Sequence, residues 1–160
     1  MPTPANLLLG VSVEGHETFG RLHQLYYINH PDRLCFVSFE PLISMIPLAM
    51  VFDMPRSAGW VIVGGESGPK ARPCNIEWIR SVVAQCAEAG VPCFVKQLGA
   101  NSVTDNTNLY DFPDFTQFDT VAWGAGTATG AAVILDDSKG GDTSEWPPEF
   151  QVQQYPTVSA

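Results

Sequence analysis

The chain has 160 residues, of which 45% are hydrophobic, and its formal net charge at pH 7 is −9. This length predicts one folded domain, and no apolar run reaches the roughly 20 residues of a membrane helix. The acidic balance argues against binding to a nucleic-acid backbone, and a start without a basic region argues against a secretory signal, so we expect a cytoplasmic protein.

The first predicted unit is a strand followed by a helix. An apolar run over residues 7–13 predicts a strand that ends at Glu14, and apolar side chains at helical spacing predict a helix over residues 18–28. The second unit begins with a strand over residues 34–39, which ends at Glu40. The apolar residues 43–52 after it form either a short helix or a buried loop.

The third unit begins with WVIV at residues 60–63, a β-branched and aromatic run that favours a strand buried on both faces. The strand ends in two glycines, and Glu66 follows. The next helix has clear ends, because Asn75 is a plausible N-cap and Gly90 a C-terminal glycine. A fourth strand is expected from Cys93 and leads to Lys96.

Residues 101–160 differ from the rest of the chain. Residues 1–100 hold eight acidic and seven basic residues, whereas residues 101–160 hold nine acidic residues and one basic residue, Lys139. We expect an irregular loop with scattered aromatic residues over 101–120, a short strand within 131–135 and an extended piece over 150–155. The domain prediction is therefore a βα-repeat core over 1–100, with 101–160 as an acidic extension packed on it.

The acidic extension supports two interpretations. It could bind a basic protein partner, or it could simply keep the protein soluble. The residues that we select for partner binding are Asp136, Asp137, Asp142, Glu145 and Trp146.

Three glutamates recur at the predicted strand ends. Glu14, Glu40 and Glu66 are each 26 residues apart, and Lys96 comes 30 residues after Glu66. A repeat of this length predicts βα units in an open parallel sheet or a partial (βα) barrel, in which polar side chains meet at the carboxyl ends of the strands. We call Glu14, Glu40, Glu66 and Lys96 the rim. Such carboxylates could perform acid–base chemistry or bind a divalent cation, or they could simply mark where buried strands reach water.

The loop after the third strand is a candidate anion site. Backbone amides near Gly64 and Gly65, together with Ser67, Lys70 and Arg72, could hold one anion. The loop lacks the Gly-Lys-Ser/Thr of a phosphate loop, so a purely structural glycine turn is the alternative.

The four cysteines are Cys35, Cys74, Cys86 and Cys93. No pair has the spacing of a zinc or iron–sulfur site, so we expect no metal in this chain. Three of them fall in strand or helix patterns as small buried residues. Cys74, beside a loop, is the candidate for a reactive thiol.

Six segments resemble a known family. In chain order they are PANLLLGVSVE, FVSFEPL, WVIVGGESGPKARP, IEWIRSVVAQCAEAGVP, CFVKQLG and SKGGDTSEWPPEFQVQQYP. Together they resemble the carboxyl-terminal part of the phage gp-thirty-seven/gp-sixty-eight family, a domain of unknown function in phages and bacteria. The likeness runs from Pro4 to Pro156 and is lowest across residues 101–135.

That family is similar to radical-SAM enzymes such as the spore photoproduct lyase group, and its members typically carry an amino-terminal cysteine cluster that would hold an iron–sulfur cluster. This chain has no such cluster, and Phe39 stands where many relatives have a cysteine. The resemblance implies the later half of a βα barrel, not active alone and without a cofactor of its own. S-adenosylmethionine and an iron–sulfur cluster would enter only with a partner half.

Two hypotheses for function follow. The chain could be a shortened, phage-encoded relative that binds a protein partner, such as a host defence complex that it inhibits, or a second copy of itself, through exposed sheet edges. It would then act in the cytoplasm of an infected or lysogenic bacterium. Alternatively, it is the substrate-binding half of a radical-SAM-like enzyme whose iron–sulfur half is on another chain.

Overall fold

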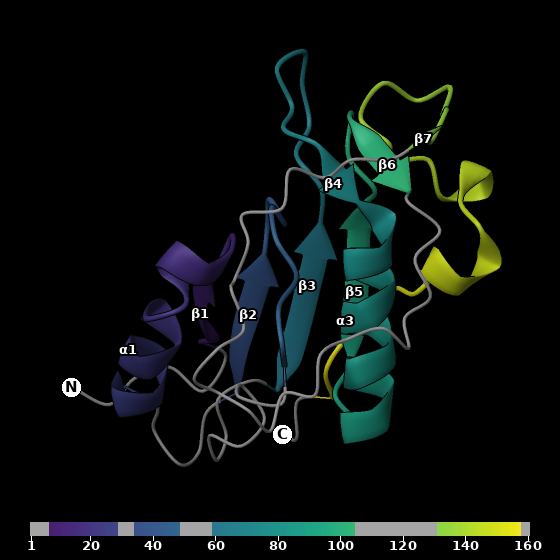
Figure 1. Cartoon of the computed structure of the whole chain (residues 1–160). Helices are drawn as coiled ribbons and strands as arrows, with labels where there is room; N and C mark the ends of the chain where they lie inside the picture. Colours follow the sequence, from purple (N-terminus) through teal and green to yellow (C-terminus); the bar gives the residue numbers. More distant parts are fainter. Residues whose placement is uncertain (1–6, 29–33, 49–58, 105–130, 158–160) are drawn as a thin grey trace.

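The computed structural model describes residues 7–28, 34–48, 59–104 and 131–157 (Figure 1). Its centre is a parallel sheet with the strand order β1-β2-β3-β5. The strands are β1 (Leu9–Ser12), β2 (Cys35–Phe39), β3 (Trp60–Gly64) and β5 (Cys93–Gln97). The expected parallel α/β sheet is therefore confirmed, and within the described residues it is open.

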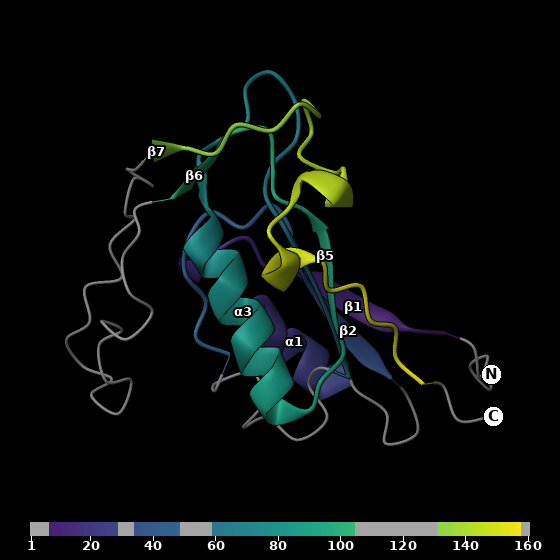
Figure 2. The same ribbon diagram turned by 90° about the vertical axis from the view of Figure 1, so that its right-hand side faces the viewer.

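Two α-helices cover one face of this sheet. They are α1 (Arg21–Ile28) and α3 (Ile76–Ala89), and Figure 2 shows both on the same side of the strands. As expected, Asn75 caps α3 by accepting a hydrogen bond from the backbone N–H of Glu77, and Gly90 ends it at φ 67°. The first helix starts later than predicted, after the 3-10 turn η1 (His16–Thr18), because the Thr18 hydroxyl accepts from the backbone N–H of Glu14.

The core lies between the helices and the sheet face that they cover. Alternate strand residues point into it, as the period of two requires. Its central members are Val37, Phe39, Val61, Val63 and Val95 from the strands, Leu22 and Leu25 from α1, and Ile79, Val82 and Cys86 from α3. Residues 43–48 form a loop with Ile46, Pro47 and Leu48 buried, and residues 49–52 lie outside the described residues.

A second, small sheet was not predicted as such. It consists of β4 (Cys74–Asn75), β6 (Ser102–Thr104) and β7 (Ala131–Ala132). Strands of two or three residues carry no readable periodicity, which is why β4 and β6 were missed. The strand expected within residues 131–135 pairs over its first two residues, and the aromatic residues expected in a loop at 105–120 lie outside the described residues.

The C-terminal segment lies along the outer edge of β5. After the 3-10 turns η3 (Thr143–Glu145) and η4 (Pro148–Phe150), the Val95 N–H donates to the Val152 carbonyl and the Gln154 N–H to the Cys93 carbonyl, each at 2.8 Å. Trp146 and Phe150 belong to the same core as the central sheet. We call residues 148–155 the strap. The expected extended piece is thus present from residue 152 onward.

At the opposite edge of the sheet, Arg21 Nη1 donates to the Ser12 carbonyl of β1 at 2.8 Å. Both edges of the sheet therefore have bonds from elsewhere in the chain, which reduces the number of backbone groups left for another chain to pair with. None of the helices in the described ranges is long and apolar enough to cross a membrane.

Candidate functional site

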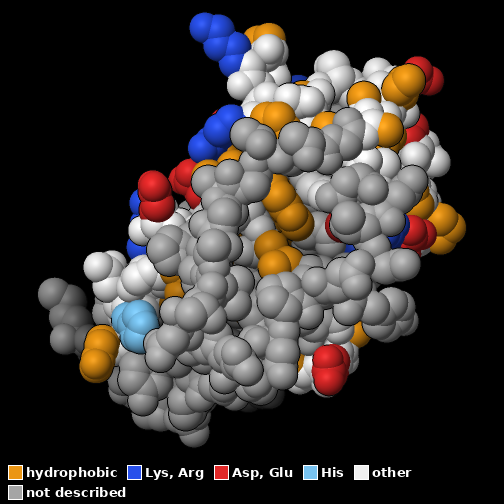
Figure 3. Space-filling view, in the orientation of Figure 1, with side chains coloured by type: hydrophobic (Ala, Val, Ile, Leu, Met, Phe, Trp, Pro, Cys, Tyr) orange, Lys and Arg blue, Asp and Glu red, His pale blue; other side chains and the backbone are white. Residues whose placement is uncertain are grey.

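The rim residues lie at the carboxyl edge of the sheet, where the three glutamates follow β1, β2 and β3 and Lys96 is the fourth residue of β5. Parallel pairing aligns Ser12 with Ser38 and Ser38 with Ile62, so the residues two positions later, Glu14 and Glu40, continue the same row. In Figure 3, acidic and basic side chains lie side by side near the ends of β1 and β2. The predicted gathering of charges at the strand ends is therefore present, and it divides into two ion-paired groups.

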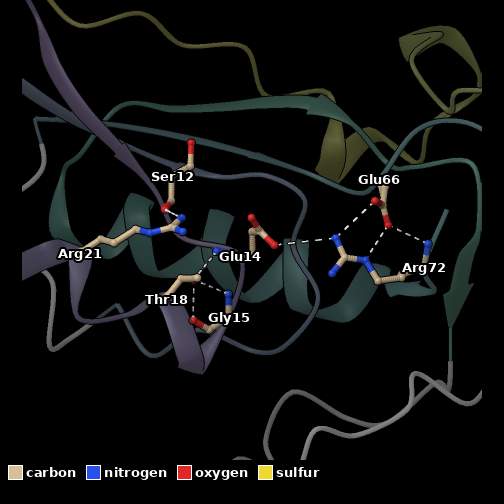
Figure 4. A network of polar contacts seen from close by, with 7 residues as sticks. All are labelled: Ser12, Glu14, Gly15, Thr18, Arg21, Glu66 and Arg72. Carbon is tan, nitrogen blue, oxygen red and sulfur yellow. Dashed lines mark hydrogen bonds and ion pairs between the residues drawn. The ribbon is translucent and has the colours of Figure 1, made fainter.

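The first group is Arg72 between two glutamates (Figure 4). Its backbone N–H and its Nε both donate to Glu66 Oε2, at 2.9 and 2.8 Å, and its Nη2 donates to Glu66 Oε1 at 3.3 Å. Nη2 also lies 3.8 Å from Glu14 Oε2. The hydrogen bond from the Arg72 side chain, followed by that from its backbone, lowers the pKa of Glu66 below its ordinary value.

The loop from Glu66 to Arg72 is shaped so that its two ends meet. Gly68 has φ 105°, which an L-residue rarely adopts, and the Ala71 N–H donates to the Gly68 carbonyl at 3.1 Å. Asn101 Nδ2 holds the far side of the loop through the Ala71 carbonyl at 3.1 Å. This turn brings Arg72 back over the strand end that it has just left.

The second group is Glu40 with Lys96 and Ser38. The Ser38 hydroxyl donates to Glu40 Oε2 at 3.0 Å, and Lys96 Nζ lies 3.3 Å from Glu40 Oε1. The Glu40 side chain is 18% exposed, whereas that of Lys96 is 56% exposed. Glu40 Oε1 is inaccessible to water and has no hydrogen-bond donor among the described residues, since the lysine lies at ion-pair distance without hydrogen-bond geometry. Glu40 therefore retains acceptor capacity at this atom.

The two glycines of the motif allow close approach of the backbone. A Cβ on Gly64 would lie 3.1 Å from Glu40 Oε1, and a Cβ on Gly65 would lie 2.2 Å from the Leu98 carbonyl oxygen. The Gly65 N–H donates to the Gln97 carbonyl at 3.1 Å, and Gln97 Nε2 returns a bond to the Gly65 carbonyl at 2.7 Å. These contacts join β3 to β5 just below the rim.

These bonds bear on the predicted anion site. The Gly65 amide and the Arg72 donors are engaged within the chain, Arg72 by the carboxylate of Glu66. Lys70 and Ser67 are exposed at the turn. An external anion would compete with Glu66 for the charge of Arg72. Anion binding stays a prediction for Gly64, Gly65, Ser67, Lys70 and Arg72. The close backbone approach at Gly64 and Gly65 is enough to explain the two glycines without an anion.

The residues selected for partner binding hold their own loop together. Asp137 accepts backbone hydrogen bonds from Lys139, Gly141 and Asp142, and the Glu145 carboxylate accepts from the backbone N–H groups of Asp136 and Asp137. Asp142 caps η3 by accepting from Ser144. Trp146 is 3% exposed and donates from Nε1 to the Gly140 carbonyl. Partner binding by this segment stays a prediction, with the indole buried in this conformation.

The cysteines do not fit an iron–sulfur cluster. All four are buried thiols outside any disulfide, and within the described residues no group of three or more His, Cys, Asp or Glu side chains is placed to hold a metal ion. The candidate for reactivity was wrong: Cys74 is 1% exposed, and burial raises its pKa to about 12. We assign no described residue of this chain to S-adenosylmethionine.

Sequence reasoning placed Arg72 in an anion site and missed its position between Glu14 and Glu66. The spacing from Glu66 to Arg72 around a Ser-Gly-Pro turn was the available signal, because such a turn returns the chain on itself. Ser38, one residue inside its strand end, was visible in the sequence, but its bond to Glu40 was not predicted.

Comparison with known proteins gave one match. The family model described as "Protein of unknown function (DUF5131)" matches residues 1–137. Neither the curated proteins nor the solved structures gave a match.

Proposed function

Since the chain belongs to the DUF5131 family of proteins of unknown function, we propose a function from the rim itself: the binding of a small organic cation by Glu40. The chain then acts as a substrate-binding part of a βα fold and is not a complete catalyst. The observation that supports this is the buried oxygen Oε1 of Glu40, which has no hydrogen-bond donor among the described residues.

The charges around Glu40 favour a cation over an anion. Glu66 receives three hydrogen bonds from Arg72, so the charges of these two side chains compensate each other. Glu40 has one hydroxyl donor and one lysine, and that lysine is the more exposed member of its pair. An ammonium group that displaces Lys96 toward solvent would gain a hydrogen bond to Oε1 and keep the charge balance.

Isothermal titration calorimetry with butylamine, butyrate and inorganic phosphate tests the proposal. We expect butylamine to bind with a Kd of about 1–10 mM, given its small size, and the two anions not to bind. Glu40→Gln should abolish butylamine binding, whereas Glu88→Gln, which removes an exposed carboxylate of α3, should not. Phosphate binding that depends on Arg72 would instead support the anion site.

The resemblance described above would place this site in the later half of a radical-SAM-like barrel, with the iron–sulfur cluster and S-adenosylmethionine held by another chain. We retain this as a proposal for the larger assembly. It predicts that the chain alone stays colourless after iron–sulfur reconstitution and gives no heat of binding with S-adenosylmethionine. Binding of either group by this chain would contradict the division of roles.

One observation favours the alternative of a protein partner. Ile134 is 90% exposed and lies two residues before the exposed Asp136, so an apolar side chain stands out from an acidic segment. A basic partner with an apolar pocket would suit this pattern. The test is capture of a stoichiometric partner from bacterial lysate at low salt, which Ile134→Ser should abolish and Ala132→Ser should leave intact. Equal capture by both variants would exclude this surface.

A further inference from the structure

We propose that the ligand of the rim is an aromatic amine, with its ammonium group at Glu40 and its ring on the sheet face that the helices leave uncovered. This inference rests on the proposed function and specifies its substrate class. It also depends on side chains outside the rim, namely a cluster of aromatic residues on the same sheet face as Glu40, toward the amino-terminal ends of the strands.

Strand alternation places the two parts on one face. Phe36, Ser38 and Glu40 are alternate residues of β2 and its extension, and they point away from the core that holds Val37 and Phe39. Within the described residues, the α-helices lie on the other side of the sheet (Figure 2). The face that carries Glu40 is therefore the one without a helix.

The pairing register orders this open face into rows. Gly10, Phe36 and Trp60 are aligned in the first row, and Ser12, Ser38, Ile62 and Phe94 in the second. Glu14, Glu40 and Gly64 continue into the third row. Along the strand direction the face thus changes from a row with Phe36 and Trp60, through a row that mixes hydroxyl, aliphatic and aromatic side chains, to a charged row. A ligand with an apolar end and a charged end would match this change.

The aromatic end is a cluster of ring edges and faces. Trp60 lies 6.4 Å from Phe94 and 5.8 Å from Tyr155, measured between ring centroids, and Phe94 lies 5.3 Å from Tyr155 in an edge-on arrangement. The strap supplies Tyr155 and fixes the indole, since Trp60 Nε1 donates to the Gln154 carbonyl at 3.0 Å. Tyr155 is 68% exposed, so an added planar ring can reach it.

The distance between the two ends sets the size of the ligand. Glu40 Oε1 lies over β3, 3.1 Å from where a Cβ on Gly64 would be, and Phe94 is on the neighbouring strand β5, one row earlier. Two residues along a strand and one strand spacing across together span about 8 Å. A phenyl ring joined to an amine by two carbons covers about that distance. Lys96 follows Phe94 on the same face and is the group that the ligand's ammonium would replace beside Glu40.

The experiment is calorimetry on the whole chain with three probes. Phenethylamine has both the ring and the charge, butylamine has the charge alone, and 3-phenylpropionate has the ring with the opposite charge. We expect phenethylamine to bind at least tenfold more tightly than butylamine, and 3-phenylpropionate not to bind. Tyr155→Ser should bring the ratio of the two amines close to one, whereas Tyr27→Ser, at another exposed tyrosine, should leave it unchanged.

The outcomes separate the two proposals. If both amines bind with equal affinity and both are lost in Glu40→Gln, the ring contact is wrong and the cation site stands. If neither amine binds, or if Glu40→Gln binds them as the natural chain does, both proposals fail. Binding of 3-phenylpropionate as tight as that of phenethylamine also overturns both, because the charge would then have no role.

Discussion

Arg72 donates to one oxygen of Glu66 from its backbone and from its side chain, at 2.9 and 2.8 Å. The two residues are the ends of a seven-residue loop, so this carboxylate closes the loop in the way that a bound anion would. The third bond, to Oε1, gives the guanidinium its planar, two-oxygen contact. The loop at the carboxyl edge of the sheet is thus held closed by the Glu66 carboxylate.

Replacing Arg72 should loosen this loop more than it destabilises the fold. Because the Arg72 side chain is 48% exposed, we expect Arg72→Ala to lower the free energy of unfolding by about 1 kcal/mol or less. Arg72→Lys should resemble it, since an ammonium cannot make the two-oxygen contact. Hydrogen exchange of the Ala71 and Ala100 amides, both bonded to carbonyls of the loop, should accelerate in both variants and not in Lys70→Ala. Unchanged exchange would show that the loop does not depend on this pair.

The Glu66 pair should give stability a specific pH dependence. Its folded pKa lies below the ordinary 4.5, so its contribution is complete above about pH 4.5 and is lost as the pH falls through the lower folded value. We expect the difference in unfolding free energy between the natural chain and Glu66→Gln to be constant from pH 5 to 7 and to shrink below pH 4.5. The pKa of Asp137 is also lowered, by backbone N–H groups led by that of Gly141, but its effect cancels in this comparison. A difference that grows in acid would contradict the assignment.

Gly65→Ala should be severe because its Cβ would meet backbone. The nearest atom, the Leu98 carbonyl oxygen, would be 2.2 Å away, and it belongs to the segment that follows β5. We expect a loss of about 1–3 kcal/mol or a failure to fold, as for an overpacked core. Gly20→Ala is the matched control, since a Cβ there would have no heavy atom within 4 Å. Urea unfolding of the two variants measures the contrast, and equal losses would show that close approach is not the reason for Gly65.

Local signals explain what could be predicted of this fold. The 26-residue repeat depends on each strand being an apolar run that ends in a glutamate, and the N-cap Asn75 depends on its immediate neighbours. Both features depend on short stretches of sequence, so they could be predicted from the sequence alone. The alignment of Glu14 and Glu40 then followed from parallel pairing, because equal repeats place equal positions in the same row.

The unpredicted features depend on residues far apart in the chain. The contact of Arg72 with Glu14 requires a loop conformation and a sheet order that no local pattern encodes. The strap along β5 likewise joins residues about 60 positions apart, as Cys93 and Gln154 do. Burial of Cys74 was misjudged because β4 has only two residues and resembles a loop in sequence.

The buried cysteines should be unreactive in the folded protein. The thiolate is the reactive species, and burial raises the pKa of Cys74 to about 12, while Cys86 is shifted upward first by its hydrogen bond with Cys93 and then by burial. We expect labelling by iodoacetamide at pH 8 to proceed at the rate of unfolding for all four thiols, and to be complete within minutes in 6 M guanidinium chloride. Labelling of Cys74 ahead of the other three would restore it as a reactive residue.

Arg80 should control whether the strap stays on the sheet edge. From α3 it makes an ion pair with Glu77, donates to Glu149 Oε1 at 2.9 Å, and lies 5.0 Å from the centre of the Phe150 ring. Glu77 is 6% exposed, so loss of the guanidinium removes the cation that pairs with a buried carboxylate. The Thr104 hydroxyl still donates a hydrogen bond to that carboxylate. Because Arg80 is itself 30% exposed, we expect Arg80→Ala to cost about 1–3 kcal/mol, less than a fully buried pair.

The location of the amides that exchange faster in Arg80→Ala distinguishes loss of the strap contact from general destabilisation of the fold. In Arg80→Ala the Gln154 and Val95 amides, which pair the strap with β5, should exchange faster than the amides between β2 and β3. Glu149→Gln, which removes the strap half of the ion pair and leaves Glu77 compensated, should show the same pattern at a smaller amplitude. If exchange rises evenly over the whole sheet in Arg80→Ala, Arg80 supports the core through Glu77 and does not hold the strap.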